Sequence, residues 1–333
     1  MVLQRKIAIY VLLVLGLASC NKEFGPQSVS GNVVVPDSSL AIIVNEGNFQ
    51  WGNASLGQFD PDNSTYQDGI FRSANDRFLG DVIQEAHQIR DHFYLVMNGS
   101  NELVICDRNW QQLKSVAGLG APKNLWFWNQ SLWMTDLFQP QLQQFDLDGN
   151  LIATFDLSQS PSQILHWQDQ LIIAFPKKLK RLNTVNNKFE DLSQFNNELQ
   201  AILELDQGLV LAFDNARIEY WANPDSAREL ISTKSILPNA LSADPSTNSF
   251  FSFDGDSLYA HTRDRSYEAS ALLALKTENY YGLDFHPQTK SLYLFDAKSY
   301  VQPHRVVRID ASTGTILDDF SAGALPNGLV KRW

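Results

Sequence analysis

The chain has 333 residues, of which 44% are hydrophobic, and a formal net charge of -11. This composition can supply a sizeable core, either in two domains or in one large repeat or barrel domain. A chain with this acidic balance is a poor partner for nucleic acid or anionic lipid, so neither is expected as a ligand.

The N-terminal residues have the pattern of a lipoprotein signal followed by a tether. A positive start leads into an apolar run over 7–18, which is too short to span a bilayer as a helix. Residues 17–20, Leu-Ala-Ser-Cys, resemble a bacterial lipobox. We therefore predict a signal peptide over 1–19, lipidation of Cys20 and a tether over 20–40. An ordinary secretory signal or a membrane anchor is the alternative. The implied location is the outer membrane, on its cell-surface or its periplasmic side.

An apolar strand over Ala41 to Val44 leads into a long connection over 45–55, which contains Phe49 and Trp51. A second strand, Leu56 to Phe59, leaves this connection, and a third is predicted over Tyr66 to Phe71. Adjacent strands need only about two to five residues to turn. The connection is therefore either a stiff structural corner or a recognition surface.

Sets of four short strands then recur at a spacing of about 40 residues, the period of a four-stranded propeller blade. The sets are separated by turn residues, and no long segment shows a helical period. They are read at 84–89, 93–97, 102–106 and 112–116, at 124–128, 132–135, 142–145 and 151–155, at 281–285, 291–296, 305–310 and 316–320, and in further sets that begin near Ile164, Ala201 and Ala240.

These sets make six complete blades, preceded by a three-stranded fragment. The tail, Pro326 to Trp333, can supply the missing innermost strand of that fragment, which closes the ring and leaves no sheet edge exposed. We predict a single all-β domain over 41–333, a seven-bladed β-propeller of four-stranded blades. Six or eight blades, or another all-β arrangement, are the alternatives. Alternating Trp126, Trp128 and Trp133 are expected to pack between blades.

The two faces of such a ring carry different connections. One face, called the turn face, has the short polar turns that join first to second and third to fourth strands, such as 91–92, 129–130 and 169–170. The other, called the loop face, has the second-to-third loops and the links between blades, which are longer and more aromatic. Because function concentrates in loops that a rigid scaffold positions, we predict that the loop face binds the ligand. Capping of the blades by these aromatics is the alternative.

Signals for catalysis or metal binding are scarce. The chain has no glycine-rich phosphate loop, no Gly-x-Ser-x-Gly elbow, no paired-cysteine zinc spacing and no His-Glu-x-x-His motif. The stretch from Asp60 lacks the glycine and the bidentate carboxylate of a calcium loop and is interpreted as a turn. Cys106 is expected to be a buried apolar residue. His87 and His166 fall on or beside innermost strands, so one of them could face the central channel. We expect no cofactor, no metal and no enzyme activity, with a lactonase-like hydrolase as the minor alternative.

Both ends of the propeller region resemble the YncE-like propeller lipoproteins of Bacteroidetes. Asn-Glu-Gly-Asn-Phe at 45–49, Gly-Asn-Ala-Ser at 52–55 and Asp-Pro at 60–61 are similar to the opening of that family. Tyr-Gly-Leu-Asp at 281–284 and Asp-Ala-Lys-Ser-Tyr-Val-Gln-Pro at 296–303 are similar to its last blade. The resemblance spans residues 41–330 and is sharpest at these two ends, which a closed ring would make neighbours.

This family includes a surface lipoprotein that binds cobalamin above a TonB-dependent vitamin B12 transporter. The resemblance therefore implies capture of a corrinoid on one face and its handover to an outer-membrane channel. A corrin is a broad, partly apolar disc with an amide fringe, so aromatic side chains can pack on it while polar side chains bond its amides. The candidate ligand-binding residues are Asn45, Asn48, Phe49, Trp51, Asn53, Phe138, Tyr281, Lys298 and Tyr300. A propeller of the cell envelope that binds a protein or a glycan is the alternative.

Overall fold

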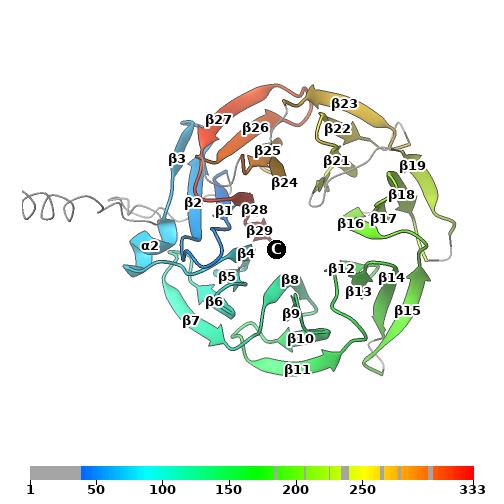
Figure 1. The fold of residues 1–333 in the computed structure, drawn as a ribbon, viewed down its shortest axis with the longest axis horizontal. Helices are drawn as coiled ribbons and strands as arrows, with labels where there is room; N and C mark the ends of the chain where they lie inside the picture. The colour runs from blue at the N-terminus through cyan, green and yellow to red at the C-terminus, as the bar shows by residue number, and fades with distance from the viewer. Residues whose placement is uncertain are drawn as a thin grey trace, which may run out of the picture.

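The computed structural model describes residues 39–183, 186–205, 208–224, 226–233, 240–262, 266–276, 279–298 and 303–333. Seven sheets stand around a central axis, each with its innermost strand toward that axis (Figure 1). This arrangement confirms the prediction of an all-β, seven-bladed propeller. The predicted signal peptide, Cys20 and Tyr300 lie outside the described residues, as does all but the end of the tether.

The blades are up-and-down sheets whose strand order follows the chain, except that blades 1 and 2 each receive their innermost strand from the chain end. Blade 1 contains β1 (Ala41–Asn45), β2 (Ser55–Asp60) and β3 (Thr65–Gln67), and blade 2 contains β4 (Ile83–Ile89), β5 (His92–Met97), β6 (Glu102–Cys106) and β7 (Gln112–Ala117). Blade 3 contains β8 (Pro122–Trp128), β9 (Ser131–Asp136), β10 (Gln141–Phe145) and β11 (Leu151–Asp156), and blade 4 contains β12 (Gln163–Trp167), β13 (Gln170–Phe175), β14 (Lys178–Asn183) and β15 (Lys188–Gln194).

The remaining blades repeat this order. Blade 5 contains β16 (Leu199–Leu205), β17 (Gly208–Phe213), β18 (Arg217–Trp221) and β19 (Glu229–Ser232), and blade 6 contains β20 (Leu241–Asp244), β21 (Ser249–Phe253), β22 (Ser257–His261) and β23 (Ala269–Ala274). Blade 7 contains β24 (Tyr280–His286), β25 (Ser291–Asp296), β26 (Arg305–Asp310) and β27 (Ile316–Ser321). The strands predicted for blades 2, 3 and 7 agree with these bounds to within one or two residues at each end.

The core lies between neighbouring blades. Second strands such as β9, β17 and β25 are buried along their whole length, because both of their faces pack against other blades. Fourth strands such as β11 and β27 alternate between exposed and half-buried residues, because they form the rim of the ring. Trp133 is buried in this core, as predicted, and Cys106 is buried in blade 2.

The predicted third strand of blade 1 is wrong beyond Gln67. The chain leaves β3 through Gly69, whose φ of 76° lies in the left-handed region, and then forms the short helix α2 (Ile70–Asn75). Ile70 and Phe71 are the buried residues of this helix, so their apolar character does not require a strand. Asn75 Nδ2 donates to the carbonyl oxygens of Phe71 and Trp110, so α2 joins the rims of blades 1 and 2 (Figure 1). Among the described residues, no helix is long and apolar enough to cross a membrane.

The chain end closes the ring at two places. β28 (Pro326–Leu329) pairs antiparallel with β1 and is the innermost strand of blade 1, as the sequence predicted. β29 (Lys331–Arg332) continues past blade 1 and pairs parallel with β4, so blade 2 is a five-stranded sheet. The tail therefore connects blades 1 and 2 as well as closing blade 1, and its last residues lie at the centre of the ring (Figure 1).

Candidate functional site

The connection between β1 and β2 is a fixed loop on the loop face. Its backbone is bonded to the chain end, where the Glu46 N–H donates to Leu325 O at 2.8 Å. It is also bonded to the link before β4, where the Gln50 N–H donates to Asp81 Oδ2 at 2.9 Å. Gly47 has a φ of 83°, and a Cβ atom there would lie 2.6 Å from the backbone nitrogen of Ala54. The Gly47 backbone passes so close to that of Ala54 that only glycine fits at this position.

Asn45, a candidate ligand-binding residue, has no exposed surface. Its Nδ2 atom donates to Ser55 Oγ at 3.0 Å, to the Tyr66 hydroxyl at 3.0 Å and to Asp68 Oδ1 at 3.2 Å. Burial also raises the pKa of the Asp68 carboxyl. The Asn45 amide therefore holds together the strands of blade 1 and has no surface with which to contact a ligand.

Asn48 and Asn53, two further candidates, bond each other across the loop. The Asn48 N–H donates to Asn53 Oδ1 at 2.7 Å, and Asn53 Nδ2 donates to Asn48 Oδ1 at 3.2 Å. This reciprocal pair shapes the turn between them. Phe49 and Trp51 project from that turn and are 68% and 59% exposed, so most of each side chain is open to solvent.

Phe138 projects from the loop face in the same way and is 79% exposed. Its loop is fixed by the buried carboxylate of Asp136, whose Oδ1 accepts the N–H groups of Phe138 at 2.8 Å and Gln139 at 2.7 Å. The structure therefore presents three of the predicted aromatics to solvent on rigid loops. Because rigid aromatics lose little entropy on binding, such side chains are suited to recognition.

Tyr281 and Lys298 belong to blade 7, which closes against blade 1. The Glu46 carboxyl accepts hydrogen bonds from Tyr281 and Asn327, which lower its pKa. Burial has the larger effect and raises the pKa of Glu46 above its usual range. The Lys298 N–H donates to Asp296 Oδ1 at 2.8 Å, and its carbonyl oxygen accepts from Asn279 Nδ2 at 3.0 Å. The ring thus brings the two regions of family resemblance together, as expected for neighbouring blades.

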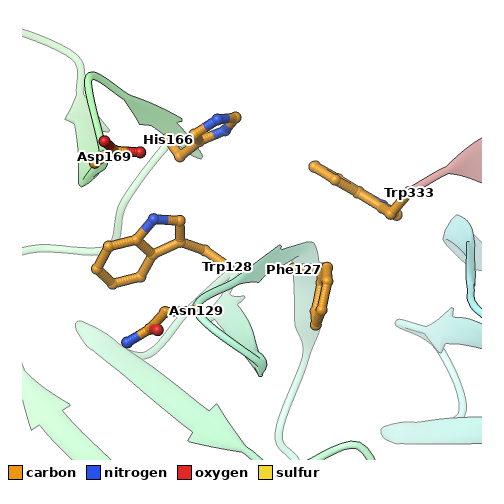
Figure 2. A pocket seen from close by; sticks show the side chains of 6 residues that line it. All are labelled: Phe127, Trp128, Asn129, His166, Asp169 and Trp333. Atoms are coloured by element: carbon orange, nitrogen blue, oxygen red, sulfur yellow. The ribbon is translucent and has the colours of Figure 1, made fainter.

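A pocket of about 690 Å³ lies on the opposite face, called here the aromatic pocket. Its volume is within the range of small-molecule sites. Asn129 and Asp169 in its lining belong to first-to-second-strand turns, so it opens on the turn face, where the sequence indicated only plain turns. The lining residues, which Figure 2 shows, are Phe127, Trp128, Asn129, His166, Asp169 and Trp333.

Trp333 enters this pocket from the chain end. Its N–H donates to Gln88 O at 3.0 Å, and its indole Nε1 donates to His87 Nδ1 at 3.0 Å. Its ring also meets Trp126 edge to face, with 4.5 Å between ring centroids. His87 is fully buried, and burial lowers the pKa of its imidazole, which keeps Nδ1 available as an acceptor. The sequence singled out His87 and His166 as channel candidates but did not place Trp333 beside them.

A cluster of titratable side chains lies next to the pocket, in which His87 is buried, Glu85 is largely buried and the Lys331 side chain is 43% exposed. Lys331 Nζ donates to Glu85 Oε1 at 2.8 Å, and Glu85 Oε2 lies 3.1 Å from His87 Nε2. Burial alone would raise the pKa of Glu85, but the Lys331 ammonium and the His87 contact outweigh it and hold the pKa well below its usual range. Among the described residues, no three histidine, cysteine, aspartate or glutamate side chains are grouped as metal ligands.

Asp284 is expected to make the stability of the ring depend on pH. Its Oδ2 accepts the Leu329 N–H of the closing strand at 2.7 Å, and burial raises its pKa from 3.8 to about 6. Since the folded-state pKa is the higher one, this contribution to stability is complete below the unfolded value and is lost as the pH rises through 6.

The side chain of Asp284→Asn stays neutral at every pH. We therefore expect the free energy of unfolding of this variant, relative to that of wild type, to rise by about 2 kcal/mol when the pH is raised from 4 to 8. Urea unfolding of both proteins at the two pH values measures this difference. A difference that does not change with pH would show that Asp284 is not protonated preferentially in the folded state.

No protein-family model and no curated protein matches the chain. The fold is similar to that of two solved proteins, each described as a "putative 6-phosphogluconolactonase". The one from Bacteroides fragilis has 12% identity, coverage of 89% of this chain and 97% of its own, and a TM-score of 0.62. The one from Bacteroides uniformis has 12% identity, coverage of 87% and 97%, and a TM-score of 0.62. BamB from Moraxella catarrhalis has 11% identity, coverage of 92% and 89%, and a TM-score of 0.54. At these identities the likeness shows a shared propeller fold alone.

Proposed function

We propose that the protein is a lipid-anchored binding propeller that captures a corrinoid on its loop face and passes it to a TonB-dependent transporter. The observation that carries this proposal is the exposure of Phe49, Trp51 and Phe138 on loops whose backbones are fixed. Large exposed apolar side chains that are held in place commonly mark interaction sites. A partly apolar disc with an amide fringe is a ligand that such a surface suits.

The anchor and the tether make the handover geometrically feasible. Lipid attached at Cys20 would hold the protein at the outer membrane without a spanning helix. A tether over 20–40 can extend to about 70 Å, because each extended residue spans at most about 3.6 Å. Either face of the ring could therefore turn toward a transporter in the same membrane. The described residues that would contact the corrinoid are Phe49, Trp51 and Phe138, with Tyr281 and Lys298 from blade 7.

We expect the purified mature protein to bind cyanocobalamin at micromolar concentration. The double variant Phe49→Ala/Trp51→Ala should bind at least about tenfold more weakly, because buried aromatic contacts dominate such interfaces. Its melting temperature should stay unchanged, because both side chains are mostly exposed in the unbound protein. Titration calorimetry and thermal melting measure the two quantities.

The matched control is Leu151→Ala, which removes an exposed apolar side chain from the rim strand β11 and should bind like wild type. If the wild-type protein shows no binding at micromolar concentration, the corrinoid part of the proposal is removed. If the double variant loses stability instead of affinity, the loop aromatics pack the blade and do not bind the ligand.

A lactonase is the second candidate function, favoured only by the descriptions of two proteins of similar fold. Those descriptions imply a substrate that carries a phosphate group. No lysine or arginine is among the six side chains that line the aromatic pocket, so this pocket offers no cation to pair with phosphate. Hydrolysis of 6-phosphogluconolactone by the purified protein, above the spontaneous rate, would favour the lactonase over the binding propeller.

A further inference from the structure

The aromatic pocket lies on the turn face, so corrinoid capture on the loop face leaves it without a role. Figure 2 shows the rings of Trp128, Phe127 and Trp333 bordering one opening, although Trp333 comes from the far end of the chain. These rings are held in place before any ligand arrives. The Trp333 ring is fixed by its bond to His87, and the Trp128 ring packs on that of Trp133, with 6.2 Å between the ring centroids. Flat apolar surfaces that are already ordered lower the entropy cost of binding.

Three polar groups accompany the rings. Asn129 and Asp169 are exposed at the tips of the turns after β8 and β12, and His166 lies on β12 between them and the central axis. His166 is half-buried, with Nδ1 3.1 Å from Glu204 Oε2, and burial lowers the pKa of its imidazole. The set therefore offers an amide that donates and accepts, an imidazole whose Nε2 atom remains for a ligand because Nδ1 lies against Glu204, and a carboxylate that accepts.

The charges in the pocket decide between ligand classes. An anion would meet the Asp169 carboxylate with no lysine or arginine among the lining residues, in a chain whose net charge is -11. A quaternary ammonium ion suits aromatic faces and would be attracted by the Asp169 carboxylate, but it has no N–H or O–H group with which to bond Asn129 or His166. A sugar ring has apolar C–H faces that can lie on indole rings, and its hydroxyl groups both donate and accept.

We propose that the aromatic pocket is a binding site for an uncharged saccharide. Its ring faces pack on Trp128 and Trp333, and its hydroxyl groups bond Asn129, His166 and Asp169. The pocket volume of about 690 Å³ leaves room for more than one sugar ring. The site is separate from the loop face, so a single molecule of the protein can hold a saccharide and a loop-face ligand at the same time.

The test is an array of uncharged, sulfated and sialylated oligosaccharides probed with the purified mature protein, followed by calorimetry with the uncharged oligosaccharide that binds most tightly. We expect Trp128→Ala to weaken that binding by at least about tenfold. Because Trp128 also packs on Trp133, two further variants protect the test against a folding defect. These are Asn129→Gly and Asp169→Gly, whose positions have φ values of 48° and 59° that glycine adopts without strain.

Each glycine variant should melt like wild type and bind the saccharide several-fold more weakly. Leu317→Ala, an exposed position on the rim strand β27, is the control and should bind normally. Phe49→Ala/Trp51→Ala should also leave saccharide binding unchanged, so a failure of the corrinoid proposal and a failure of this one are distinguishable. The proposal is overturned if no uncharged oligosaccharide binds, if only charged ones bind, or if all three pocket variants bind like wild type.

Discussion

Removal of residues 326–333 is expected to abolish cooperative folding of the propeller. This truncation deletes β28, the innermost strand of blade 1, and leaves β1 as an unpaired edge facing the centre of the ring. It also removes the buried side chains of Leu329 and Val330 and the hydrogen bond from Leu329 to Asp284. The loss exceeds what a domain with about 5–15 kcal/mol of net stability can tolerate.

Circular dichroism and thermal melting measure this outcome, together with the fraction of soluble protein. Removal of residues 331–333 alone is the graded control, because it deletes β29 and Trp333 but keeps β28 paired with β1. This shorter truncation should fold and melt at a lower temperature than wild type. A cooperative transition at the wild-type temperature in the longer truncation would show that β28 does not close the ring.

Glu85→Ala is expected to give the largest loss of stability among single substitutions of charged residues. Glu85 joins three parts of the ring: Lys331 of the tail, His87 of its own strand and blade 3, where Oε2 accepts the Leu125 N–H at 2.9 Å. Its removal leaves that N–H without an acceptor and Lys331 without its counter-charge. We expect a loss of about 2 kcal/mol at pH 7 in urea unfolding, because the largely buried Leu125 N–H loses its acceptor, whereas the Lys331 side chain is 43% exposed and keeps contact with water.

The exposed pair of Arg108 and Asp91 provides the matched control. Asp91→Ala removes an ion-paired carboxylate from the surface and should change stability by less than about 0.5 kcal/mol. Because the pKa of Glu85 is lowered in the folded state, its contribution is complete above the ordinary carboxyl pKa and is lost as the pH falls through the folded-state value. The difference in free energy of unfolding between wild type and Glu85→Ala should therefore become smaller at acid pH. Equal effects of the two substitutions at pH 7 would contradict a structural role for the cluster around Glu85.

The strand pattern was predictable because its signals are local. Alternation of apolar residues and the Asn, Asp and Gly residues of tight turns occur within a few positions of each strand, so the blades could be counted. The error at Tyr66 to Phe71 has an equally local cause. Ile70 and Phe71 are apolar in either a strand or a buried helix, and only the left-handed turn at Gly69 separates the two.

Side-chain exposure at the candidate site was predictable only in part. Asn45 and Phe49 are four positions apart in one loop, yet Asn45 is buried among Ser55, Tyr66 and Asp68 while Phe49 points into solvent. An asparagine in a loop can bond a ligand or the backbone of its own protein, and the sequence does not distinguish the two. The exposed aromatics Phe49, Trp51 and Phe138 do lie on the face that the loop lengths favoured.

The amino-acid sequence by itself determined the blade architecture, the number of blades and the role of the tail in closing blade 1, since each follows from periodicity along the chain. Only the tertiary structure decided that β29 adds to blade 2 and that Trp333 lines one pocket with Trp128 and His166. These residues are far apart in the chain and become neighbours only when the ring closes. No single segment of the sequence therefore carries a pattern that indicates the aromatic pocket, and the sequence predicted only short polar turns on the turn face.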